Sequence, residues 1–71
     1  MNEEALNMQI RKFLKKTGIT SQRSIEQAVR DGLQDGSIQL GDSVEATMHL
    51  SIRKLGLDVD IVENLQIEAE N

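Results

Sequence analysis

The chain has 71 residues, 38% of them hydrophobic, with no cysteine and a formal net charge of −4. This length allows a single domain over residues 1–71, and the lack of cysteine excludes disulfide frameworks, thiol nucleophiles and cysteine-ligated zinc sites. No stretch is apolar enough to span a membrane or to act as a signal peptide, so the sequence predicts a cytoplasmic protein with no membrane partner.

Residues 3–17 are predicted to form a first helix. Asn2 is a suitable N-cap, and the two glutamates that follow it favour the positive end of the helix dipole. Gly18 falls just after the last turn, where a left-handed glycine commonly ends a helix. The spacing therefore predicts a tight corner over residues 17–21. The apolar positions of this helix recur at helical spacing and are Leu6, Ile10, Phe13, Leu14 and Thr17.

A second helix is predicted over residues 21–35. Thr20 and Ser21 offer alternative N-caps at its start, and Asp35 and Gly36 mark its end. The same helical spacing recurs within it. Its apolar positions are Ile25, Ala28, Val29, Gly32 and Leu33.

From Ser37 onward the apolar residues alternate with polar ones, which is the pattern of β-strands. A loop over residues 53–56 would place Ile52 opposite Leu57, and a loop over residues 62–64 would place Ile61 opposite Leu65. With these registers the apolar residues of all the strands share one face. The predicted strands cover residues 37–40, 44–53, 57–62 and 65–70.

Together these elements predict an α+β fold, with two N-terminal helices packed on one face of a three- or four-stranded antiparallel meander. The meander has four strands if residues 37–40 form a strand, and three if they only extend a loop. A chain of this size buries only about 60% of the surface that its unfolded form exposes. Phe13 is the only aromatic residue, so the core lacks large fillers. A dimer that shares a core is therefore expected.

The charges are divided unevenly along the chain. Residues 1–30 carry six basic and three acidic residues, a net charge of +3, whereas residues 31–71 carry two basic and nine acidic residues, a net charge of −7. Such asymmetry can steer charged partners towards one part of a protein. It is equally typical of helices with solvated lysine faces, and both interpretations stay open.

The predicted corner has the layout of a DNA-binding helix-turn-helix, and a following hairpin would make it winged. Against this hypothesis, Ser24 and Gln27 fall where that motif usually has apolar residues, only two helices are predicted, and the net charge is negative. Two packed helices as a plain scaffold are the favoured interpretation. In the alternative, the nucleic-acid contacts would be Lys12, Lys15, Lys16, Gln22, Arg23, Gln27 and Arg30.

No other residues make a convincing site. His49 is the only histidine and falls on the polar side of the longest predicted strand, so a surface histidine is favoured over a metal ligand or general base. Asp58 and Asp60 share a strand face, and a solvated edge is favoured over a cation site. The serines and threonines have no base in the sequence to activate them. The sequence thus assigns no catalytic residue, no metal ligand and no cofactor, and an enzyme is not expected.

Residues 2–26 carry the pattern NEEALNM-x-IRKFLKK-x-G-x-TSQR-x-IE. This pattern resembles that of a family of small bacterial proteins known only as a domain of unknown function. The resemblance implies a stand-alone bacterial cytoplasmic protein and brings no activity, cofactor or site residue with it. The expected function is a non-enzymatic protein-interaction module that binds another protein or itself. The first alternative is a winged-helix-like nucleic-acid binder, and the second is an enzyme or small-ligand binder.

Overall fold

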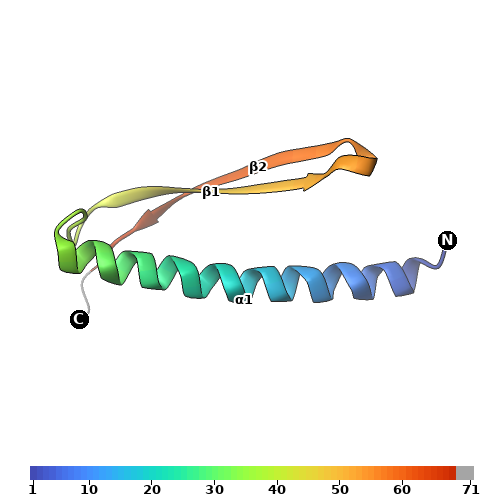
Figure 1. Ribbon diagram of the computed structural model, residues 1–71, viewed down its shortest axis with the longest axis horizontal. Coiled ribbons are helices and arrows are strands. Elements are labelled where there is room, and N and C mark those ends of the chain that lie inside the picture. The colour runs from blue at the N-terminus through green and yellow to red at the C-terminus, as the bar shows by residue number, and fades with distance from the viewer. Residues whose placement is uncertain (69–71) are drawn as a thin grey trace. The chain divides into compact units, whose positions relative to one another are not determined.

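The computed structural model describes residues 1–68 (Figure 1). They form one helix, α1 (Glu3–Asp35), and two strands, β1 (Ser43–Ile52) and β2 (Leu57–Gln66), with a short 3-10 helix, η1 (Arg53–Leu55), between the strands. The chain divides into two compact units, Met1–Ser37 and Ile38–Asn71. The first unit holds α1 and the second holds the β-hairpin, and each is described by itself.

The ends of α1 follow the capping rules that the sequence predicted. The Asn2 side chain accepts a hydrogen bond from the backbone N–H of Ala5 at 3.1 Å, which satisfies one of the free donors of the first turn. At the other end Gly36 adopts the left-handed conformation, with φ of 83°. This conformation ends a helix at little cost when the residue is glycine. The predicted N-cap and the predicted end at Asp35 and Gly36 are confirmed.

The predicted corner over residues 17–21 is wrong, because α1 continues through it for a total of 33 residues. Gly18 is not among the glycines with positive φ, so it does not close a helix there. A glycine inside a helix costs only about 1 kcal/mol relative to alanine, and the helical hydrogen bonds on both sides of it offset this cost. Ser24 also donates a hydrogen bond to the Thr20 carbonyl one turn earlier, at 3.1 Å. The predicted helices 3–17 and 21–35 are therefore one element.

The hairpin confirms the predicted pairing around its turn. β1 and β2 are antiparallel, and Ile52 faces Leu57, as expected from the sequence. η1 and Gly56 make the turn, where Gly56 has φ of 64° and donates its backbone N–H to the Arg53 carbonyl at 3.1 Å. The same register continues along all ten residues of each strand, to Ser43 opposite Gln66.

The rest of the predicted meander is wrong. β2 does not turn over residues 62–64 but continues to Gln66, so the predicted strand 57–62 and the first two residues of the predicted strand 65–70 belong to one strand. Residues 67 and 68 lie beyond its end. The physical reason is that β1 has ten residues, and only a continuous partner pairs the backbone groups of all ten. Residues 69 and 70 of the last predicted strand lie outside the described residues.

Residues 37–40 form part of the connection from α1 to β1 and not a strand. The backbone groups of Gln39 are satisfied locally: the Asp42 side chain accepts from the Gln39 N–H at 2.9 Å, and the Gln39 carbonyl accepts from the Asp42 N–H at 3.0 Å. Gly41 completes this turn with φ of 94°. The predicted three- or four-stranded meander under two helices is thus corrected to one helix and a two-stranded sheet.

Little apolar surface is buried in the part of the chain that the structure describes. Ile67, which is 8% exposed, is its only buried hydrophobic side chain. Ile67 extends the base of the hairpin, because its N–H donates to the Asp42 carbonyl at 2.8 Å and its carbonyl accepts from the Gly41 N–H at 2.6 Å. Within residues 1–68, no helix is both long and apolar enough to cross a membrane.

Candidate interaction surfaces

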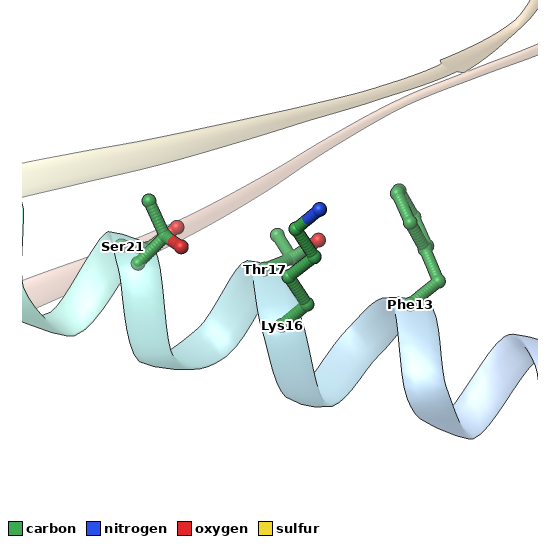
Figure 2. A pocket seen from close by; sticks show the side chains of 5 residues that line it. Phe13, Lys16, Thr17 and Ser21 are labelled. Atoms are coloured by element: carbon green, nitrogen blue, oxygen red, sulfur yellow. The ribbon is translucent and has the colours of Figure 1, made fainter.

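One side of α1 carries an apolar row that we call the helix stripe. Its large members are well exposed, from 42% for Leu6 to 56% for Phe13. Figure 2 shows Phe13, Thr17 and Ser21 projecting from the same side of α1, with Lys16 beside them, around a shallow hollow that Thr20 also lines. The stripe therefore passes through the place of the predicted corner. Its members are Leu6, Ile10, Phe13, Leu14, Thr17 and Ser21.

The hairpin also has an apolar side, which we call the hairpin face. Side chains alternate between the two faces of a strand, and directly paired residues share a face. Applied to the observed register, this rule puts nine apolar residues on one face together with a single charged residue, Glu63, which lies opposite Ala46. The apolar residues of the hairpin face are Val44, Ala46, Met48, Leu50, Ile52, Leu57, Val59, Ile61 and Leu65.

The opposite face of the hairpin is polar apart from Val62 and centres on His49. Its Nδ1 lies 2.6 Å from the Asp60 carboxylate and its Nε2 lies 3.2 Å from the Asp58 carboxylate. Asp60 is the direct cross-strand partner of His49, and Asp58 lies two residues earlier on the same strand as Asp60. All three side chains are more than half exposed, and exposed pairs of this kind contribute little to stability. Within residues 1–68, no group of three His, Asp or Glu residues has the arrangement of a metal site.

The residues predicted to contact nucleic acid all lie on α1, where the helical spacing divides them. Those at positions 12, 16, 23, 27 and 30 recur at intervals of four, seven, four and three, so they follow one side of α1. Lys15 and Gln22 are seven residues apart and project from another side. Gln27 donates a hydrogen bond to the Asp31 carboxylate at 2.9 Å, which reduces its freedom to contact a partner.

The arrangement that the winged-helix hypothesis requires is not formed by the described residues. In that arrangement a second helix leaves a corner at an angle, so that its first turn enters the major groove. Here Gln22 and Arg23 lie in the middle of a continuous helix, and no helix end presents them. The lysines and arginines of α1 are exposed, and within residues 1–68 they take part in no ion pair.

The Asp35 carboxyl group lies at the junction after α1. The Asp35 carboxylate accepts hydrogen bonds from the Ser37 hydroxyl at 2.6 Å and from the Ser37 backbone N–H at 2.8 Å. Both bonds favour the charged form and hold the pKa of Asp35 below its usual range, with the hydroxyl as the larger cause. The Ser37 hydroxyl also lies 3.4 Å from the Gly32 carbonyl. This group closes the helix end and is not part of either apolar surface.

Sequence reasoning missed two of these features. The helix stripe was divided between two predicted helices, although Thr17 and Ser21 continue its spacing directly, which was the available signal. The contact between His49 and Asp60 follows from the register that was predicted, because a sheet that pairs Leu50 with Val59 also pairs their outer neighbours. In both cases the sequence contained the signal: helical spacing for the stripe and strand register for His49 and Asp60.

Comparison with known proteins adds a family but no activity. The model of a family described as a family of unknown function, DUF6494, matches residues 1–68. The predicted resemblance to a family of unknown function is therefore confirmed, and it covers the hairpin as well as the N-terminal half. Neither the curated proteins nor the solved structures contain a match to this chain.

Proposed function

Because the chain belongs to DUF6494, a family of unknown function, we propose its role from its own surfaces: a non-enzymatic protein-interaction module. The binding surfaces in this proposal are the helix stripe and the hairpin face. Its bacterial origin and its cytoplasmic location stay predictions from the sequence.

The observation that carries this proposal is the amount of apolar side chain left in water. Seventeen large hydrophobic residues are exposed, against one buried hydrophobic residue in the described part of the chain. Scattered surface hydrophobics are normal, but contiguous apolar patches of several hundred Å² mark interaction sites. A two-stranded hairpin is also marginal in water unless another element covers its apolar face. Binding to a partner would cover both the helix stripe and the hairpin face.

An enzyme is less well supported. A catalytic site requires polar groups that converge on a concave, water-excluding pocket. The hollow on α1 presents one ionisable side chain, that of Lys16, beside the hydroxyl groups of Thr17, Thr20 and Ser21. The hydrogen-bonded group around His49 lies on an open strand surface. Neither arrangement combines a base, a nucleophile and a pocket.

Photo-crosslinking in living cells tests the proposal directly. A photoreactive amino acid at Phe13 or at Val59 places the probe on the helix stripe or on the hairpin face. The same probe at Arg23 or at Asn64 serves as the matched control, because these positions lie on the polar sides of the same two elements. We expect discrete protein adducts from the first pair of positions only. Adducts from none of the four positions, or from all four equally, would contradict the proposal.

A further inference from the structure

The outer edge of β1 has backbone groups without a partner in the part of the chain that the structure describes. In an antiparallel pair, each strand directs only alternate N–H and C=O groups towards its neighbour, so half of those in β1 point away from β2. The described sheet has two strands, and α1 uses its own backbone groups for helical hydrogen bonds. Neither β2 nor α1 can therefore pair with this edge, and its hydrogen bonds go to water or to a strand of another molecule.

β1 lacks the features that usually protect an open strand edge, which are proline, lysine, bulges and charged residues on the apolar face. It has no proline and no lysine, its ten residues pair one to one with β2, and its residues on the hairpin face are all uncharged. The edge of β2 is better protected. Asp58, Asp60 and Glu63 belong to β2, and two copies that met at its edge would bring three carboxylates from each chain together. The edge of β1 is therefore the one that favours an added strand.

The sequence of β1 is complementary to itself in one antiparallel register. When Thr47 lies opposite Thr47 of a second copy, paired residues are alike in polarity, so the apolar sides of the two strands coincide. Glu45 then lies opposite His49 of the second copy, and this pair occurs twice because the contact is symmetric. A register shifted to either side loses this pair. The apolar pairs are Val44 with Leu50 and Ala46 with Met48.

We propose that β1 of one copy pairs with β1 of a second copy in this register, which joins two hairpins into one four-stranded antiparallel sheet. A two-stranded hairpin is marginal in water, whereas three or more strands with an apolar face stabilise one another. The contact goes beyond the proposed function, because it is made by the backbone of a strand edge and leaves the helix stripe and the hairpin face free for a partner.

Glu45 and His49 favour a second copy of this chain over a strand of another protein. Glu45 is exposed and has no ion-pair partner within residues 1–68. His49, whose ring contacts Asp58 and Asp60 across the hairpin, is the only residue of β1 that can carry a positive charge. Opposite charges on directly paired residues stabilise a sheet, and like charges destabilise it. The edge of β1 thus supplies the partner for its own carboxylate, twice in each dimer.

Single cysteines test the register, because the natural chain has none. In the proposed dimer, Ser43 of one copy lies opposite Ser51 of the other, and neither position lies near itself. Full-length chains with Ser43→Cys and with Ser51→Cys, distinguished by tag length, are mixed in oxidised glutathione. We expect a disulfide-linked product that contains one chain of each kind, and little product from either variant alone.

Thr47→Cys repeats the test with one variant, because position 47 lies opposite itself in the proposed register. Val62→Cys is the matched control, since Val62 pairs with Thr47 but belongs to the strand on the far side from the contact. We expect a disulfide-linked dimer from Thr47→Cys and not from Val62→Cys.

Added charge tests the edge without a crosslink. Thr47→Lys is expected to raise the dimer dissociation constant about 5-fold, because it places two ammonium groups opposite each other. Val62→Lys makes a similar change on the same exposed side of the hairpin and is expected to leave dimerisation unchanged. Sedimentation measures both variants, and we expect the natural chain at twice 7.9 kDa.

The outcomes separate this inference from the proposed function. A mass of 7.9 kDa for the natural chain at high micromolar concentration overturns the edge dimer. So do equal disulfide yields at positions 47 and 62, or a mixture of the two serine variants that gives no mixed product. If photo-crosslinking at Phe13 or Val59 still attaches another protein, the interaction module stands without the edge dimer. A dimer with the expected disulfides but no such adducts supports the edge and overturns the proposed function.

Discussion

At the scale of single residues, Ser37 controls the charge of Asp35 at the end of α1. Its hydroxyl and its backbone N–H both donate to the Asp35 carboxylate, and they lower the pKa of that group. The variant Ser37→Ala keeps the backbone donor and removes the hydroxyl. We therefore expect the pKa of Asp35 to rise towards its ordinary value, and we would measure it by carboxyl-carbon NMR titration. Ser51→Ala, a change of the same kind on β1, is the control.

The sign of the accompanying pH dependence follows from the direction of this shift. A carboxyl group whose pKa is lower in the folded chain contributes stability above its unfolded pKa. That contribution is lost as the pH falls through the folded pKa. Ser37→Ala should therefore reduce the pH dependence of unfolding in the acidic range below the ordinary aspartate pKa. An unchanged Asp35 titration in this variant would show that the hydroxyl has no role.

At the scale of elements, Gly18 and Gly36 distinguish a continuous helix from a helix corner. A methyl group added at Gly18 meets no atom within 4 Å, and Gly18 is not in the left-handed region. Gly18→Ala should therefore stabilise the chain by about 1 kcal/mol, measured by urea unfolding. Gly36 has φ of 83°, so Gly36→Ala should destabilise the chain by about 1 kcal/mol. Destabilisation by Gly18→Ala would contradict the continuous helix and would support the predicted corner over residues 17–21.

The alternating strand pattern predicted the hairpin only in part. The alternation in the sequence was sufficient to predict β1, its turn and the partners Ile52 and Leu57, because a shift of one residue would place apolar residues opposite polar ones. It was not sufficient to predict where β2 ends. Residues 62–64 fitted a loop, and both the turned and the continuous strand leave Leu65 on the apolar face. The greater number of paired backbone groups in the continuous strand decides between them, and local sequence does not display that difference.

The helix was also predicted only in part. Asn2 and Gly36 were predictable because a cap depends on one side chain or one φ angle. Gly18 with Thr20 and Ser21 carried the same local signals, yet the helix continues, since each signal is worth about 1 kcal/mol and the alternative loses helical hydrogen bonds. The surfaces were predictable only in part. Phe13 was identified as an apolar position, but the helix stripe emerges only once α1 is one element.

At the scale of the whole molecule, the sequence predicts a dimer whose core is shared by two chains. The shortage of large core residues in the sequence already favoured a dimer. The fold strengthens this expectation, because a single helix and a two-stranded sheet provide less cover than the two-layer domain that was predicted. The full extent of the helix stripe and of the hairpin face could not be predicted, because it depends on the continuity of α1 and on the register of β2.

The most direct test is the thermal unfolding of the natural chain over a hundredfold range of protein concentration. Binding that accompanies folding stabilises by mass action, so a dimer with a shared core unfolds at a higher temperature when it is more concentrated. We predict that the midpoint of unfolding rises steadily across this range. A cooperative transition whose midpoint does not change with protein concentration would show that one chain folds alone, and would contradict the predicted dimer.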